Sequence, residues 1–206
     1  MIDHLVYAVN DLDVSLAELS SRFGVSATPG GRHLGWGTRN ELFSLGACYL
    51  EVIGPDLDDP RDVMPFGIEA LSHPTLVAWC ARPIRGIAAI VDDARRAGVV
   101  LGPVRAMARE RLDGVRLAWE LTMPQMIPGQ IAPMPFFIDW GATPHPTTSL
   151  PPALELLQLR VGHPDPEWLS TTLADLGELD AVEVVEAAHV SLSAVIRTPD
   201  GSLVLS

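Results

Sequence analysis

The chain has 206 residues, of which 26 are acidic and 14 basic, giving a formal net charge of −12 at pH 7. This acidic excess disfavours nucleic acids and anionic membranes as partners, because neutralising phosphates requires clustered cations. Every basic residue is an arginine, which excludes Schiff-base chemistry at a lysine, and a hydrophobic content of 48% is ample for a large core.

No apolar run reaches the roughly 18–20 residues that span a bilayer, and the first residues lack the pattern of a secretory signal. We therefore expect a cytoplasmic protein without a membrane partner. Cys48 and Cys80 are the only cysteines, and both lie in apolar, strand-like segments. They are expected to be buried free thiols, and two cysteines cannot build a zinc finger.

The first third of the chain reads as strand, helix and three strands. Alternating residues over 2–9 predict a strand, and an apolar stripe predicts a helix over 12–23 that ends at Gly24. Pro29-Gly30-Gly31 predicts a turn. Residues 38–53 predict a hairpin that turns at Gly46, and a short helix is expected over 63–72.

A second unit repeats this order after about 70 residues. It comprises a strand over 75–81, a helix over 84–97, and strands over 99–107, 115–122 and 136–140, with a turn at Asp113-Gly114 and a loop over 123–135. The repeat aligns Glu51 with Asp139 and leaves His4 opposite Leu76. Such a period indicates a duplicated module rather than a solenoid.

The remaining residues predict a third element. A proline-containing linker from 143 to 152 precedes a strand over 154–161, a helix over 167–176 and strands over 181–187, 190–197 and 202–205. Pro199-Asp200-Gly201 predicts the last hairpin turn. We expect this strand-helix-strand element, residues 142–206, to pack on the preceding domain.

Three polar residues stand out because their neighbours are apolar. His4 lies on the first strand, while Glu51 and Asp139 each lie inside an apolar strand, where a carboxylate is costly unless it is paired or binds a metal. Alternatively, Glu51 could lie on a solvent-exposed face of the sheet, and Asp139 could be a charge on an edge strand that prevents aggregation. His33 and Asn40 lie in a glycine-rich segment where the backbone can approach a ligand closely.

The chain resembles the glyoxalase-like domain proteins of the vicinal oxygen chelate superfamily. The resemblance lies in the order of these elements, in His4 on the first strand and Glu51 on the fourth, and in the segment Gly31-Arg32-His33-x-Gly35-x-Gly37-Thr38-x-Asn40. The resemblance implies an α+β fold in which paired βαβββ modules form a cupped mixed β-sheet with helices outside. The domain would cover 1–141, with modules over about 1–62 and 73–141.

The resemblance also implies a site. A divalent metal ion (Mn, Fe, Zn, Ni or Mg) would be held by His4, Glu51 and Asp139 and would chelate vicinal oxygens of a small-molecule substrate. His33 and Glu51 would be catalytic, through isomerase, lyase or dioxygenase chemistry. Trp36, Asn40, Trp140 and His145 would bind the substrate. Metal-dependent members usually take ligands from both modules, and here the first strand of the second module has no histidine.

Two other functions remain open at this point. The same cup without a metal would bind or sequester a small molecule, with Trp36, Trp79, Phe136, Phe137 and Trp140 lining an apolar pocket, although each of these aromatic residues also suits a core. Alternatively, the chain retains only the fold and serves in assembly. The resemblance makes a homodimer plausible.

Overall fold

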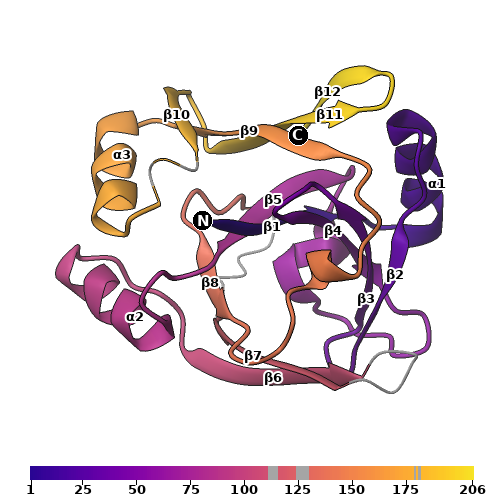
Figure 1. The fold of residues 1–206 in the computed structure, drawn as a ribbon, viewed down its shortest axis with the longest axis horizontal. Helices are drawn as coiled ribbons and strands as arrows, with labels where there is room; N and C mark the ends of the chain where they lie inside the picture. Colours follow the sequence, from indigo (N-terminus) through magenta and orange to yellow (C-terminus); the bar gives the residue numbers. More distant parts are fainter. Residues whose placement is uncertain (111–115, 124–129, 179, 181) are drawn as a thin grey trace.

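The fold is seen in a computed structural model that describes residues 1–110, 116–123, 130–178, 180 and 182–206. Eight strands form one mixed sheet in the order β2-β3-β4-β1-β5-β8-β7-β6, and four more form a second sheet in the order β10-β9-β11-β12. Figure 1 shows the small sheet on one side of the molecule and β6 and β7 on the opposite side. None of the helices within the described ranges combines the length and apolar character that crossing a membrane requires.

The first module contains β1 (Ile2–Ala8), α1 (Leu12–Phe23), β2 (Thr28–His33), β3 (Thr38–Ser44) and β4 (Tyr49–Pro55). The predicted end of α1 at Gly24 is confirmed, and Asp11 caps its start. Asp11 accepts a hydrogen bond from the Val14 N–H, and Gly24 ends the helix with a φ of 71°. Strand β1 pairs in parallel with β4, which brings the two ends of the module together at the middle of the sheet.

The second module contains β5 (Thr75–Ala81), α2 (Ile87–Arg96), β6 (Val104–Glu110), β7 (Arg116–Thr122) and β8 (Phe136–Asp139). A 3-10 helix η1 (Pro65–Ala70) precedes it where a short helix was predicted. Strand β5 pairs in parallel with β8 and antiparallel with β1. The two modules therefore meet at β1 and β5 with mirrored strand orders, which confirms the predicted fold of paired βαβββ modules.

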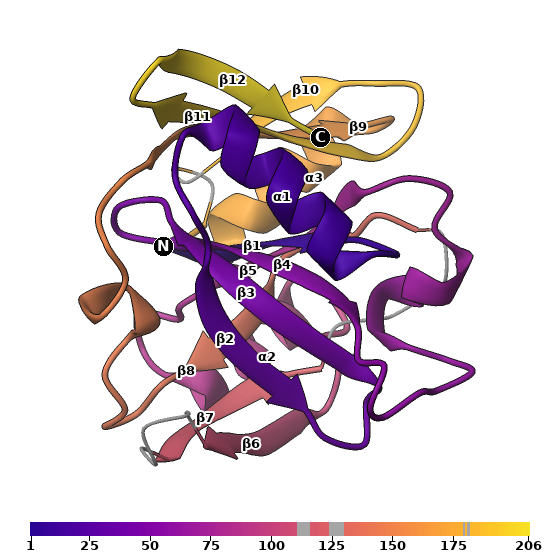
Figure 2. The ribbon, with the colours of Figure 1, turned by 90° about the vertical axis from the view of Figure 1, so that its right-hand side faces the viewer.

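The third unit contains the 3-10 helix η2 (Pro146–Thr148), β9 (Glu155–His163), α3 (Pro166–Asp175), β10 (Glu183–Glu186), β11 (Ser191–Thr198) and β12 (Gly201–Leu205). Its sheet lies beside α1 and α3, as Figure 2 shows. Leu159, Leu169 and Leu173 of this unit belong to the same buried cluster as Leu5 and Leu16 of the first module. The third unit and the large sheet thus share one hydrophobic core.

The large sheet curls so that its edge strands β2 and β6 come into contact. Its outer face packs against the helices through Leu50, Val52 and Trp79, whereas its inner face carries a separate cluster that includes Val6, Phe136 and Ile138. Because side chains alternate along a strand, Tyr49, Glu51 and Ile53 of β4 share the inner face. The inner face forms the predicted cup.

One local prediction was wrong. Pro29-Gly30-Gly31 is not a turn but part of strand β2. Gly30 is needed there for packing, because a Cβ at this position would lie 2.1 Å from Asn40 Oδ1. The predicted turn at Asp113-Gly114 and most of the predicted loop over 123–135 lie outside the described residues.

The shared core predicts that the third unit unfolds together with the first two modules. Leu173→Ala removes a fully buried side chain of α3 and should lower the free energy of unfolding by about 2–5 kcal/mol. The matched control is Leu157→Ala on β9, where the side chain is 40% exposed and the loss should be much smaller. Urea unfolding followed by tryptophan fluorescence and by far-ultraviolet circular dichroism should show one coincident transition, whereas two separate transitions would contradict a shared core.

Candidate functional site

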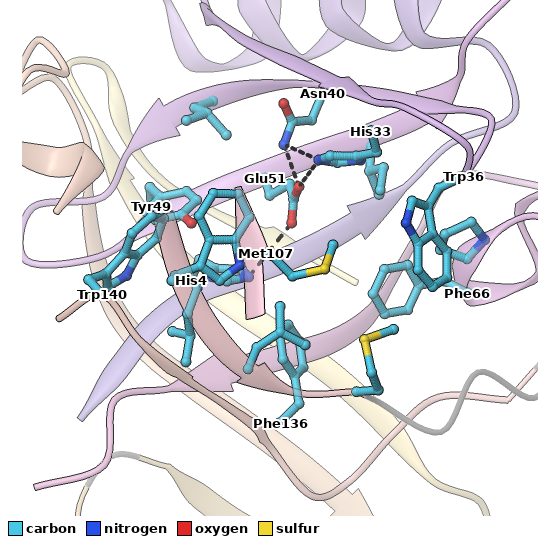
Figure 3. A pocket seen from close by; sticks show the side chains of 17 residues that line it. His4, His33, Trp36, Asn40, Tyr49, Glu51, Phe66, Met107, Phe136 and Trp140 are labelled. Atoms are coloured by element: carbon cyan, nitrogen blue, oxygen red, sulfur yellow. Dashed lines mark hydrogen bonds and ion pairs between the residues drawn. The ribbon is translucent and has the colours of Figure 1, made fainter. Parts of the chain in front are cut away.

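The cup holds a pocket that encloses about 830 Å³ including its open mouth. Trp36 and Phe66 lie toward one end of the pocket and Trp140 and Tyr49 toward the other, with Glu51 between them (Figure 3). The pocket therefore combines aromatic walls with a central carboxylate.

Glu51 lies between two imidazoles on the inner face of the sheet (Figure 3). Its Oε2 is 3.6 Å from His4 Nε2, and its Oε1 is 3.8 Å from His33 Nε2. The Asn40 side-chain amide donates a hydrogen bond to Oε1. The Glu51 side chain is only 13% exposed. The four residues come from β1, β2, β3 and β4, so a single module supplies the whole polar group.

Asn40 fixes the orientation of this group. Its Oδ1 accepts a hydrogen bond of 2.8 Å from the Gly31 N–H, which leaves the amide nitrogen to face Glu51 and His33. Because that nitrogen can only donate, we assign His33 Nε2 as an acceptor and His33 Nδ1 as the donor to Thr38 Oγ1, 3.0 Å away. The glycines of β2 thus admit the side chain that orients the polar residues.

A β-bulge places a second carboxylate behind His4. The pairing of β1 with β5 passes from Ile2–Ala81 to His4–Cys80, so Asp3 is an extra residue in β1. Strict alternation would place Asp3 and His4 on opposite faces, but the bulge brings Asp3 Oδ1 to 2.7 Å from His4 Nδ1. His4 Nδ1–H donates to Asp3, and His4 Nε2 is left facing Glu51.

Asp3 is completely buried and gathers partners from three parts of the chain. Its Oδ2 accepts hydrogen bonds from Trp140 Nε1 at 2.9 Å and from His145 Nε2 at 3.0 Å, and it lies 3.4 Å from Arg82 Nε. Burial alone would raise the pKa of Asp3, but the hydrogen bonds from His145 and His4 hold it well below its usual range. The structure therefore contains a buried, ionised carboxylate.

The predicted site residues divide into two groups. His4, His33, Trp36, Asn40, Glu51 and Trp140 all line the pocket. His145 lies behind the pocket wall and is hydrogen-bonded to Asp3. Asp139 lies on the outer face of the sheet. Its Oδ1 accepts a hydrogen bond from the Gly141 N–H, and its Oδ2 is near Gly86 at the start of α2. The structure thus does not bring Asp139 to His4 and Glu51, because Phe136, Ile138 and Trp140 occupy the inner positions of that segment.

The pocket-facing side of β8 carries no carboxylate. Phe136, which pairs with Cys80 of β5, and Ile138 both line the pocket, whereas Asp139 does not. On β4, by contrast, the pocket-lining residues include Glu51. The two modules therefore present different side chains to the cup, apolar from β8 and polar from β4.

A further group of possible metal ligands lies behind the pocket. Asp3, His4 and Cys80 have donor atoms within 4.8 Å of one another, a spacing at which a metal ion could be held. Asp3 Oδ1 and His4 Nδ1, two of these donor atoms, are already hydrogen-bonded to each other. In this arrangement the group holds the His4 ring.

Sequence reasoning missed Asp3 and Tyr49. Tyr49 stacks on the His4 ring with the centroids 4.8 Å apart, and it also packs near His145. An acidic residue inside an apolar first strand was the available signal for Asp3. Periodicity alone gave no reason to place it beside its neighbour, because that contact depends on the bulge.

The fold and the pocket together define the class of this protein. The vicinal oxygen chelate superfamily is characterised by paired βαβββ modules that form a cupped sheet, with a histidine on the first strand and a glutamate on the fourth. A family model described as "Glyoxalase-like domain" matches residues 2–177. The chain belongs to this family.

A solved structure supports the same fold. A hypothetical protein from Staphylococcus aureus has 15% identity and a TM-score of 0.64, over 98% of this chain and 83% of that one, and at this identity the likeness concerns the fold alone. The chain is also similar to methylmalonyl-CoA epimerase from Mycobacterium tuberculosis, with 18% identity and a TM-score of 0.39, over 66% of this chain and 84% of that one. A comparison with curated proteins finds no match.

The buried Asp3 carboxylate predicts a pH-dependent stability. Asp3→Asn should lower the free energy of unfolding at pH 7 by about 3–5 kcal/mol, because it leaves buried partners of the carboxylate unpaired. The folded-state pKa of Asp3 lies below the unfolded value of about 3.9, so its contribution is complete above that value and is lost as the pH falls below it.

Urea unfolding of both proteins at pH 7, 5 and 3 tests this linkage. The difference in the free energy of unfolding between the native protein and Asp3→Asn should become smaller toward pH 3. A difference that is constant from pH 7 to pH 3 would contradict the conclusion that Asp3 is ionised in the folded protein. Asp13→Asn is the matched control, because Asp13 is an exposed carboxylate paired with Arg39 and should change stability by about 0.5 kcal/mol or less.

Proposed function

We propose that this protein is a small-molecule enzyme whose pocket binds adjacent oxygens of a substrate at the His4–Glu51 pair, with a divalent metal ion as the chelating centre. The observation that carries the proposal is the placement of Glu51 between His4 and His33 at the centre of an otherwise aromatic pocket. Perturbed or paired polar groups converging in an apolar cleft are typical of active sites.

The donor atoms suit such an ion in part. The 3.6 Å between His4 Nε2 and Glu51 Oε2 is a separation that two ligands of one ion can have, and the bond from His4 Nδ1 to Asp3 is the support that ligating histidines usually receive. Phe136 and Ile138, the residues of β8 that line the pocket, supply no further donors. Two protein ligands suit Mg²⁺ or Mn²⁺ completed by water and substrate better than a zinc site with three protein ligands.

The bound ion would act as a Lewis acid toward a substrate oxygen. The chain itself would supply the rest. His33 Nε2 is assigned as an acceptor at the pocket wall and would take a proton from a bound substrate in place of its hydrogen bond from Asn40, while Thr38 holds its other nitrogen. Asn40 orients Glu51, and Asp3 holds His4 so that Nε2 faces the pocket. Isomerase, lyase and dioxygenase reactions are all compatible with these roles.

Mn²⁺ titration followed by electron paramagnetic resonance of the free ion tests the proposed ligands. The native protein should bind one ion, and His4→Ala and Glu51→Gln should each weaken binding by at least tenfold. Asp139→Asn is the matched carboxylate control and should bind as the native protein does, because Asp139 faces away from the pocket. Loss of binding in Asp139→Asn together with retention in Glu51→Gln would contradict the proposed site.

A second function is favoured by one observation. The apolar residues Phe136 and Ile138 that β8 presents to the pocket are also what a metal-free binding or sequestering protein of this fold would contain. In that case the native protein would bind no Mn²⁺ at millimolar concentration, and EDTA would leave ligand binding unchanged. The same titration therefore separates the two functions.

A further inference from the structure

The linker between β8 and β9, residues 140–154, carries a histidine that lies behind the pocket. His145 is not among the described residues that line the pocket, and its side chain is only 11% exposed. Its Nε2 is 3.0 Å from Asp3 Oδ2, and Asp3 Oδ1 in turn accepts a hydrogen bond from His4 Nδ1. The linker is therefore two hydrogen bonds away from a proposed metal ligand.

The contacts on the other side of the His145 ring determine which nitrogen carries its proton. The Thr147 backbone N–H, 3.3 Å from His145 Nδ1, can only donate, so Nδ1 accepts. The Thr147 hydroxyl oxygen is 2.7 Å from the same nitrogen and can donate to it as well. We assign the proton of the neutral ring to Nε2, which then donates to the buried carboxylate of Asp3.

His145 also supports the ring that stacks on His4. Tyr49 lies nearly parallel to the His4 imidazole at one end of the pocket, with the ring centroids 4.8 Å apart (Figure 3). The centroid of the His145 ring is 5.7 Å from that of Tyr49, and Leu150 of the linker shares a small buried cluster with Tyr49. The linker therefore reaches His4 by two routes, one through Asp3 and the other through Tyr49.

The linker is tied to the rest of the fold on both sides of His145. Near its start, the Thr143 hydroxyl donates a hydrogen bond of 2.7 Å to the Ala118 carbonyl oxygen of β7. Just beyond its end, the Leu156 N–H donates a hydrogen bond of 3.1 Å to the Leu45 carbonyl oxygen in the turn before β4. A group on a segment that is fixed in this way is suited to orient another side chain.

We propose that His145 is a positioning residue, through which the linker to the third unit holds the His4 ring with Nε2 directed at the pocket. This inference rests on the proposed function, because it concerns a proposed metal ligand. Removing a partner that orients a ligating residue typically weakens metal binding by about 10–100-fold. A displacement of the linker would therefore change metal affinity while every residue that lines the pocket stays the same.

Two substitutions of His145 separate its hydrogen bond from its shape. His145→Phe keeps a ring against Tyr49 but cannot donate to Asp3, and it should weaken Mn²⁺ binding about tenfold in the titration described above. His145→Gln carries an amide N–H that can reach Asp3 and should bind Mn²⁺ within about threefold of the native protein. His163→Phe is the control, because His163 bonds to the Asp165 carbonyl oxygen instead and should bind as the native protein does.

Histidine side-chain NMR of the metal-free proteins gives a readout that a loss of stability alone would not move. In the native protein the protons should be on His145 Nε2 and on His4 Nδ1. In His145→Phe the two ¹⁵N shifts of His4 should move toward each other, because the ring then samples both tautomers. In His145→Gln they should stay near their native values. Far-ultraviolet circular dichroism checks that each variant is folded, and the tautomer of His145 in the native protein needs no variant.

Three results would overturn the inference. The first is unchanged His4 shifts or unchanged Mn²⁺ affinity in His145→Phe, and the second is equal weakening in His145→Phe and His145→Gln. The third is a native His145 with its proton on Nδ1, because Nε2 could then not donate to Asp3. If the native protein binds no Mn²⁺, the proposed function fails, whereas the His4 shifts still decide whether His145 positions that ring. The two failures are therefore distinguished.

Discussion

The site depends on one buried carboxylate. Asp3 accepts hydrogen bonds from His4 on β1, from Trp140 after β8 and from His145 in the linker to the third unit. A buried ionised group is stable only while its partners stay in place, so these three segments are fixed relative to one another. The residue that holds His4 toward the pocket therefore also joins the two modules and the third unit.

The duplicated fold has two halves with different roles. The first module supplies the histidines, the amide and the carboxylate of the pocket, and strand β8 of the second module supplies the apolar side chains of Phe136 and Ile138. Symmetry of the backbone is thus retained while symmetry of the chemistry is lost. An asymmetric pocket of this kind can bind one end of a molecule by polar groups and the remainder by apolar contact.

The sequence predicted the helices of both modules and their strands except β2, and six of the named site residues line the pocket, because hydrophobic periodicity and glycine caps are local signals. Gly30 gave a turn signal, although it lies in β2 and makes room for Asn40.

The sequence also failed where contacts depend on register. Glu51 and Asp139 both lie within apolar strands, but only Glu51 is on the inner face. Bulges at Asp3 in β1 and near Val77 in β5 shift the register by one residue, and no periodicity reveals such a shift.

The central claim is that Asp3 binds the proton on His4 Nδ1 and leaves Nε2 directed at Glu51. Long-range ¹H–¹⁵N NMR of the histidine side chains at pH 7.5 measures this directly, with Asp3→Asn and His4→Ala used for assignment. We expect the proton to be on His4 Nδ1 and, when Mg²⁺ or a pocket ligand is added, the chemical-shift change to be confined to Nε2. A proton on Nε2 together with an unprotonated Nδ1 would contradict this orientation of His4.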